Sequence, residues 1–277
     1  MNVGVDLGGT KLAVGTAESV QIISTPATSD DIIAAIDTLA GEARGIGLCV
    51  AGRVDLQSGS TFAAQLPQLH GVPLVKQLSR PGRRITLLND ADAAALAEHQ
   101  FGAARGTHTS LYVTVSTGIG AGLVSQQRLY QGYRGQAVEL GHAGGPGQQP
   151  CPCGRTGCID VSASGTAITK AARALLGDPT VPVDTLSQMA AQGHAGIGQI
   201  VRQAAEDLAP YLGNACVLFD PQVIVMGGGV VLGYGELYLE TLRRALASTL
   251  GQWHLPEIRV AQLGRQAGIL GALQSLE

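Results

Sequence analysis

Aromatic and charged residues are scarce in this sequence, and several patterns that mark large classes of protein are missing. Aromatics make up 4% of the 277 residues and charged residues 14%, with a formal net charge of −3 at pH 7. There is no run of Lys and Arg, which argues against a surface for nucleic acid or for an anionic membrane. No stretch of about 18 apolar residues could span a bilayer, and the start, MNVGVDLGGT, lacks the regions of a signal peptide. We therefore expect a cytoplasmic protein that binds neither nucleic acid nor a membrane.

Cysteine is also rare and unevenly placed. The five Cys are an odd number, and Cys151, Cys153 and Cys158 follow one another in the spacing C-x-C-x4-C. This distribution does not resemble a disulfide framework. The other two, Cys49 and Cys216, are predicted to be small core residues. Hydrophobic residues make up 45% of the chain, which is enough for the core of one large domain or two medium ones.

The segment at 139–160 combines the three clustered Cys with an upstream His and several glycines. Three interpretations are open: a turn-rich loop with free thiols, a redox pair, or a metal site. We favour structural zinc, because three thiolates and one imidazole complete a tetrahedral Cys3His set. The predicted ligands are His142, Cys151, Cys153 and Cys158. Such a site would hold the neighbouring residues in place.

Predicted strands and helices alternate along the chain, which indicates an α/β fold. The apolar patterns predict strands at 3–6, 12–16, 20–24, 46–50, 85–88, 111–115, 121–124, 223–226 and 258–263. They predict helices at 30–39, 72–78, 91–101, 166–176, 197–219, 236–250 and 267–276. The first three strands are expected to give the fold an antiparallel start. Residues 55–69 show little periodicity and are predicted to form a loop.

Three details of these helices are predicted as well. Ser29 or Asp30 is expected to cap the first helix, because their side chains accept from free backbone N–H groups. Phe101 is expected to face inward, as are Leu96 and Ala97. Pro210 removes a backbone donor, so it should kink the longest helix or mark a break in it.

Three glycine-rich turns follow predicted strands and suit an anionic or flat ligand. In DLGGTK, at 6–11, glycines let backbone N–H groups point together at an anion, and a carboxylate is available for hydrated Mg2+. The turn STGIG, at 116–120, repeats the arrangement of strand, turn and strand, which suggests two similar halves. Each turn taken alone is also compatible with an ordinary hairpin or helix start. The candidate residues for such a ligand, which the family resemblance described below identifies as a nucleotide, are Asp6, Gly8, Gly9, Thr10, Lys11, Thr117, Gly118, Gly227, Gly228 and Gly229.

The motif NDAD follows a predicted strand and opens a predicted helix. Asn and Asp are among the best N-cap residues, so a purely structural role is open for both Asn89 and Asp90. The functional interpretation makes Asp90 a general base at a strand end and Asn89 an amide that binds a hydroxyl group. The two interpretations are compatible with each other.

Taken together, DLGGTK, NDA, STGIG, ELGH and CPCGRTGC resemble, in this order over nearly the whole chain, the ROK family of bacterial sugar kinases and regulators. The Cys-rich segment with its upstream ELGH is the specific part of the resemblance. Some motifs are similar to those of N-acetylmannosamine kinases, and ELGH is similar to that of glucokinases.

The resemblance implies a two-domain α/β, actin/hexokinase-like (ribonuclease H-like) fold with an interdomain cleft, in a homodimer. We expect a small domain at 1–105, completed by a C-terminal helix at 265–277. The large domain is expected at 106–264 and carries the zinc loop at 139–160.

The activity implied is ATP-dependent phosphorylation of a hexose or N-acetylhexosamine, most readily at the 6-hydroxyl, with Mg2+ and structural zinc. Asp90 would be the base that takes the hydroxyl proton. The sugar hydroxyls would be held by Asn89, Glu139, His142 and Asp160. Asp160 stands where the family normally has Glu. The glycine-rich turns at 6–10 and 117–118 would face the phosphates, and residues 227–229 the adenosine.

Two other functions remain open. Some relatives are non-catalytic, sugar-sensing regulators, but those carry a helix-turn-helix ahead of the kinase-like part, and here only five residues precede Asp6. A phosphotransferase that acts on a non-sugar is the third possibility, and the ELGH motif with the Cys cluster argues against it. The sugar, and the choice between ATP and polyphosphate as donor, do not follow from the sequence.

Overall fold

The computed structural model describes residues 1–63, 65–145 and 147–277, and the chain divides into two compact units. Unit 1 comprises 1–108, 122–138 and 262–277, and unit 2 comprises 109–121 and 139–261. Strands and helices alternate along both, so the predicted α/β class is confirmed. Among the described residues, no helix is both long enough and apolar enough to cross a membrane.

The first sheet belongs to unit 1 and has the order β3-β2-β1-β4-β7. Its strands are β1 (Asn2–Leu7), β2 (Lys11–Gly15), β3 (Val20–Ser24), β4 (Gly45–Val50) and β7 (Arg84–Asn89). The hairpins β1-β2 and β2-β3 are antiparallel, as predicted, whereas β1, β4 and β7 run parallel. Leu7, Val50 and Asn89 are neighbours in register, so the three parallel strands end side by side.

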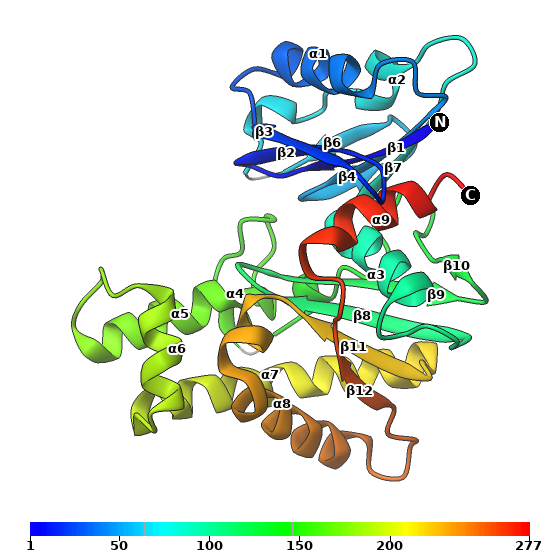
Figure 1. The fold of residues 1–277 in the computed structure, drawn as a ribbon. Coiled ribbons are helices and arrows are strands. Elements are labelled where there is room, and N and C mark those ends of the chain that lie inside the picture. The colour runs from blue at the N-terminus through cyan, green and yellow to red at the C-terminus, as the bar shows by residue number, and fades with distance from the viewer. Residues whose placement is uncertain (64, 146) are drawn as a thin grey trace. The chain divides into compact units, whose positions relative to one another are not determined.

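Helices cover this sheet with apolar residues (Figure 1). The helices of unit 1 are α1 (Ser29–Ala40), α2 (Leu74–Leu78), α3 (Asp90–Phe101) and α9 (Ala267–Gln274). Ile32 and Ile36 of α1 are fully buried in the core together with Leu74 of α2. Helix α9 packs against β1 and β4 so closely that a Cβ at Gly47 would lie 1.8 Å from the Ala272 carbonyl oxygen.

Unit 1 corrects three of the sequence predictions. The N-cap of α1 is Thr28, whose side chain accepts from the Asp31 N–H, because the helix begins earlier than either predicted cap. Phe101 ends α3 with 48% of its surface exposed, so it does not face inward. The predicted loop at 55–69 contains part of a small hairpin, although Ala64 within it lies outside the described residues. Its elements are β5 (Arg53–Asp55), β6 (Ser60–Phe62) and η1 (Pro67–Leu69).

The second five-stranded sheet has the order β10-β9-β8-β11-β12. Its strands are β8 (Thr109–Val115), β9 (Ile119–Ser125), β10 (Arg128–Leu129), β11 (Val223–Gly227) and β12 (Glu257–Val260). In chain order, both sheets therefore place their third strand at one edge, followed by the second, first, fourth and fifth. This shared order confirms that the chain contains two similar halves.

The remaining helices belong to unit 2, where α7 and α8 pack against each other. They are α4 (Asp160–Ala163), α5 (Gly165–Leu176), α6 (Val183–Ala191), α7 (Ala195–Phe219) and α8 (Gly229–Leu250). Short 3-10 turns occur at η2 (Leu140–His142) and, in unit 1, η3 (Gly264–Gln266).

Two predictions about the long helices are corrected. Helix α7 is continuous through Pro210, so the break, one of the two predicted effects of the proline, does not occur. Helix α8 begins at Gly229 and not at 236, and Gly235 interrupts it with a φ of 51°. The predicted start therefore corresponds to the second part of α8, after the non-helical glycine.

Candidate active site and metal centre

The turn between β1 and β2 in unit 1 is held by one backbone hydrogen bond and one from a side chain. The Gly8 N–H donates to the Lys11 carbonyl over 2.9 Å, and the Thr25 hydroxyl donates to the Gly8 carbonyl over 2.7 Å. A Cβ at Gly9 would lie 3.0 Å from Gln65, so this position favours glycine. Thr10 and Lys11 are exposed beside the turn. The turn thus presents open backbone, a hydroxyl and a cation to solvent.

Asp6 lies on β1 just before this turn, in register with Cys49 of β4. Its pKa is raised from 3.8 to about 6, mainly by burial and next by the charge of Asp90, while a hydrogen bond with Cys49 opposes both effects. A Cβ at Gly268 of α9 would lie 2.5 Å from the Asp6 carboxylate, so the backbone of α9 covers it closely. Asp6 is thus a constrained carboxylate whose proton is lost close to neutral pH.

Asn89 and Asp90 mark the junction of β7 and α3. Asn89 is the N-cap of α3, and its side-chain oxygen accepts from the Asp92 N–H over 2.6 Å. The carboxylate of Asp90 accepts from the Ala91 N–H over 3.0 Å. Although Asp90 is an exposed residue, desolvation raises its pKa, and the hydrogen bond from Ala91 offsets part of this rise. The side chain of Asn89 therefore caps α3, whereas Asp90 is the first residue of the helix and its carboxylate is bound by the next backbone N–H.

In unit 2, residues 116–118 connect β8 to β9, and we refer to residues 116–119 as the phosphate turn, after the ligand that the sequence predicts for it. The Gly165 N–H donates to the Ser116 carbonyl over 2.7 Å, and the Thr166 hydroxyl donates to the Thr117 carbonyl over 2.7 Å. The start of α5 therefore fixes one side of the turn. On another side, the Asp160 carboxylate accepts from the Ile119 N–H over 2.6 Å.

The three glycines at 227–229 connect β11 to α8. Gly228 has a φ of 93°, and a Cβ there would lie 2.3 Å from the Val115 carbonyl oxygen at the end of β8. Both the backbone conformation and the close approach require glycine at this position. The N-terminus of α8 is thereby placed close to the phosphate turn, where its free N–H groups favour a negative charge.

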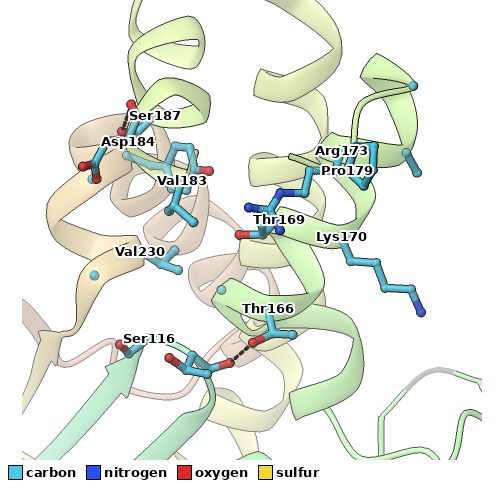
Figure 2. Close-up of a pocket in the computed structure, with 17 residues that line it drawn as sticks. Ser116, Thr166, Thr169, Lys170, Arg173, Pro179, Val183, Asp184, Ser187 and Val230 are labelled. Atoms are coloured by element: carbon cyan, nitrogen blue, oxygen red, sulfur yellow. Dashed lines mark hydrogen bonds between the residues drawn. The ribbon is translucent and has the colours of Figure 1, made fainter. Parts of the chain in front are cut away.

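A pocket of about 800 Å3 opens beside the phosphate turn within unit 2. Figure 2 shows Val183 and Val230 on one side and residues of α5, including Thr169 and Arg173, on the other. Its size is within the usual range for small-molecule sites. The lining residues are Ser116, Thr117, Gly165, Thr166, Thr169, Lys170, Arg173, Ala174, Gly177, Pro179, Val183, Asp184, Ser187, Gly229, Val230, Gly233 and Tyr234.

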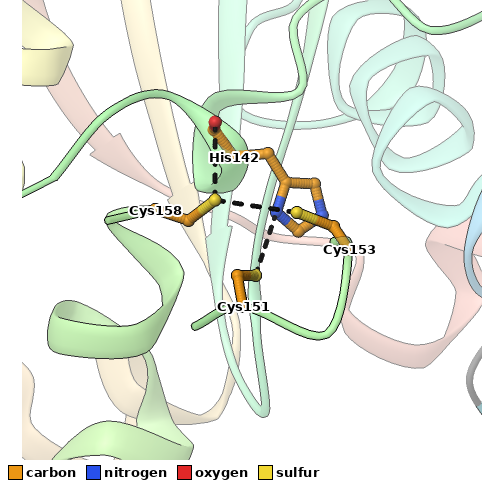
Figure 3. A group of neighbouring side chains, drawn as sticks. All are labelled: His142, Cys151, Cys153 and Cys158. Atoms are coloured by element: carbon orange, nitrogen blue, oxygen red, sulfur yellow. Dashed lines mark hydrogen bonds between the residues drawn. The ribbon is translucent and has the colours of Figure 1, made fainter. Parts of the chain in front are cut away.

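The predicted zinc ligands come together in unit 2 (Figure 3). One ligand atom from each of His142, Cys151, Cys153 and Cys158 lies within 4.8 Å of the others. The sulfurs of Cys153 and Cys158 are 3.7 Å apart, as are the Cys151 sulfur and the His142 Nδ1. The edge of a tetrahedron around zinc with thiolate ligands is about 3.8 Å. The donor set and its spacing therefore fit zinc, although Pro146 of the predicted loop lies outside the described residues.

The predicted site residues are divided between the units. Asp6, Asn89 and Asp90 belong to unit 1, as does the turn that contains Gly8 and Gly9. Glu139 directly precedes η2, and its unit also contains the zinc ligands, the phosphate turn and the three glycines. Of the predicted nucleotide-binding residues, Thr117 and Gly229 line the pocket. The sequence predictions missed the walls that α5, α6 and α8 contribute, because these carry no recognisable motif.

The ROK family profile matches residues 2–276 of the chain. The chain belongs to the ROK family. An N-acetylmannosamine kinase from Escherichia coli is 34% identical over 286 residues, which cover 97% of this chain and 95% of the relative. The resemblance inferred from the motifs is thus confirmed over almost the full length.

Solved structures agree with this assignment. A ROK hexokinase from Thermus thermophilus has a TM-score of 0.90 and 37% identity, covering 99% of this chain and 96% of the other. A ROK family glucokinase from Streptomyces griseus, crystallised with glucose and AMPPNP, has a TM-score of 0.82 and 31% identity, covering 99% and 98%. The chain therefore has the actin/hexokinase-like fold of ROK sugar kinases, as predicted.

Proposed function

We propose that this protein is an ATP-dependent kinase that phosphorylates a hexose or N-acetylhexosamine at its 6-hydroxyl. The observation that carries the proposal is the 800 Å3 pocket beside the phosphate turn. It occurs in a chain that is 31% identical to a glucokinase crystallised with glucose and AMPPNP. Location in the cytoplasm and assembly as a homodimer remain predictions.

The nucleotide would enter the pocket with its base between the apolar side chains of α6 and α8. Val183 and Val230 supply the apolar contact, and Lys170 and Arg173 supply positive charge for the phosphates. The N–H groups of Thr117, Gly118 and the start of α8 are donors for phosphate oxygens. Phosphoryl transfer depends mostly on such positioning and on charge neutralisation.

Asp6 is the residue of unit 1 that fits Mg2+ through a water shell. Its carboxylate is an oxygen ligand beside an open glycine turn, and Mg2+ prefers oxygen ligands while keeping several waters. When bound, the metal would neutralise charge on the transferring phosphate. With a pKa of about 6, Asp6 is mostly ionised at pH 7 and is available for this role.

Asp90 would act as the general base. The sugar hydroxyl loses its proton to the Asp90 carboxylate while its oxygen forms a bond to the γ-phosphorus, and the bond from that phosphorus to the β–γ bridging oxygen breaks. A base is most effective when its pKa lies near the working pH, and desolvation shifts the pKa of Asp90 upward. Asn89, Glu139, His142 and Asp160 are the candidate ligands of the sugar hydroxyls.

The zinc would have a supporting role. With His142 as a ligand, the ion would fix the short η2 turn and the residue that precedes it, Glu139. Such support keeps binding residues in the geometry they need. The chemistry of transfer does not use the zinc.

The test is an ADP-release assay with Mg-ATP and a panel of sugars: glucose, mannose, fructose, allose, glucosamine, N-acetylglucosamine and N-acetylmannosamine. We expect one preferred sugar, and Asp90→Asn should reduce turnover by about 10²-fold or more. Asp30→Asn, which changes an exposed carboxylate of the same unit, is the matched control and should leave turnover unchanged.

Three outcomes would contradict parts of the proposal. Retained turnover in Asp90→Asn would remove the assignment of the base. Transfer from polyphosphate but not from ATP would correct the donor. No turnover with any sugar, combined with specific DNA binding by the purified protein, would favour a sugar-sensing regulator over an enzyme.

A further inference from the structure

The phosphate turn forms hydrogen bonds with the start of α5, which lines the pocket, and with a second segment of unit 2 that does not. The start of α5 binds the turn through Gly165 and Thr166, which also line the pocket. The second contact comes from the segment that carries the zinc ligands, residues 139–145 and 147–160, which we call the cluster loop. This second contact gives the metal centre a direct connection to the turn.

The connection is made by the side chain of Asp160. Its Oδ1 accepts from the Ile119 N–H over 2.6 Å, and a Cβ at Gly118 would lie 3.0 Å from the same oxygen. A hydrogen bond to an ionised acceptor is about twice as strong as a neutral one. The bond also occupies the Ile119 donor, so this N–H is not available for a ligand phosphate.

The backbone before Asp160 is fixed by the cluster loop itself. The Ile159 N–H donates to the Ala143 carbonyl over 3.0 Å, and Cys158 forms a β-bridge with Gly144. A metal ligand therefore lies two residues before Asp160, and another, His142, lies directly before Ala143. Whatever holds these ligands in place therefore also fixes the backbone that leads into Asp160.

The other end of the cluster loop also contacts the turn. A Cβ at Gly141, the residue before His142, would lie 2.1 Å from the Ile119 carbonyl oxygen. The backbone of the loop thus packs directly against the same residue whose N–H is bound by Asp160. Segments that adjoin metal ligands therefore bind Ile119 at its N–H and pack closely against its carbonyl.

We propose that Asp160 is a positioning residue that couples metal binding in the cluster loop to the conformation of the phosphate turn, and through it to nucleotide binding. The coupling to the nucleotide rests on the proposed function of the pocket. The coupling of the metal to the turn rests on the contacts of Asp160 and Gly141 alone. Allosteric coupling is reciprocal, so the nucleotide would also strengthen zinc binding.

The first experiment needs no nucleotide. Hydrogen–deuterium exchange of the turn is measured in the zinc-loaded protein, in Asp160→Ala, in Asp160→Asn and in the control Glu206→Ala on an exposed face of α7. Asp160→Ala should speed exchange of the Ile119 amide about tenfold or more, given the strength of such hydrogen bonds. Asp160→Asn keeps an acceptor oxygen and should restore most of the protection. Unchanged protection in Asp160→Ala would overturn the proposal.

The second experiment measures the Kd of Mg-AMPPNP by calorimetry, with zinc content determined in the same samples. Asp160→Ala should raise the Kd about tenfold while retaining zinc. Removing zinc with a chelator should raise the Kd of the unmodified protein, but should add little in Asp160→Ala, because the connection is already broken. An equal effect of chelation in both proteins would overturn the coupling. Should Asp160→Ala fail to fold, chelation of the unmodified protein, followed by exchange at Ile119, decides the question.

The two proposals fail in different ways. If the unmodified protein binds no AMPPNP while exchange at Ile119 still depends on Asp160 and zinc, the proposed function fails and the metal-to-turn coupling stands. If Asp160→Ala changes only the KM for the sugar, with exchange and nucleotide affinity unaltered, Asp160 is a sugar ligand and the coupling is wrong.

Discussion

Replacing Asp6 by Asn should make the protein more stable at neutral pH and abolish phosphoryl transfer. Asp6 is largely enclosed between β2, β4 and the backbone of α9, and a charged carboxylate is poorly solvated there. Burial is the main cause that raises its pKa from 3.8 to about 6, followed by repulsion from Asp90. Asn has nearly the same shape and no charge, so the substitution removes the cost of ionisation.

The size of the effect follows from the pKa. Because the folded pKa lies above the unfolded value, the stabilisation associated with the protonated carboxyl is fully present below pH 3.8 and is lost as the pH rises through about 6. A difference of about 2 pKa units corresponds to roughly 3 kcal/mol at pH 7 and above. At pH 5 the pH is only about 1 unit above the unfolded pKa, so the loss of folding stability there is roughly 1.5 kcal/mol.

The assay is urea denaturation of the unmodified protein, Asp6→Asn and the control Asp30→Asn at pH 5, 6 and 7.5. The gain from Asp6→Asn should grow with pH and level off above pH 7, while the control stays flat. A gain of the same size at all three pH values would refute the reasoning, because it would come from packing and not from charge. In an Asp90→Asn background the gain should shrink, since one cause of the raised pKa is removed.

Three further predictions concern the metal, the packing and the working pH. The purified protein should contain one zinc ion per chain. Cys158→Ser should lose this zinc and lower the melting temperature, whereas Cys216→Ala, in the core away from the ligands, should keep it. In denaturant titrations, Gly47→Ala should destabilise the protein by about 3 kcal/mol or more, because the added methyl group would push α9 away. The control Gly198→Ala in α7 should be neutral or stabilising by up to about 1 kcal/mol. The kcat/KM for the sugar should fall toward acid pH because Asp90 must be ionised to act as a base and burial raises its pKa above the usual range, so a profile without any acid limb would contradict that role.

Much of the fold could be read from the sequence because its strands are short, apolar and bounded by glycine or Asn-Asp turns. The strand β3 (Val20–Ser24) has the predicted bounds. The grouping of His142 with the three Cys was also predicted, because these residue types are the preferred ligands of zinc. The motif NDAD predicted the end of a strand and the start of a helix, and the N-cap hydrogen bond of Asn89 confirms this prediction. These features depend on local sequence, so a single chain is sufficient to predict them.

The residues that line the pocket could not be predicted from the sequence, because they come from separate elements. Val183 of α6, Thr169 of α5 and Tyr234 of α8 are far apart along the chain and meet only through helix packing. None of them belongs to a motif, and each residue type is ordinary on a helix surface. Likewise, the predicted helix started only at residue 236, whereas α8 begins at Gly229 and is irregular only at Gly235.

The distribution of charge between the two similar halves has a chemical consequence. A carboxylate near Lys or Arg has a lowered pKa and is therefore a weaker base. Among the described residues, burial is the main cause that raises the pKa of both Asp6 and Asp90, the charge of Asp90 raises that of Asp6 further, and the causes that lower the two pKa values are hydrogen bonds and not cations. The cations Lys170 and Arg173 instead line the pocket of unit 2. Two sheets of the same strand order thus provide separate environments, one that keeps carboxylates basic and one that suits an anionic ligand.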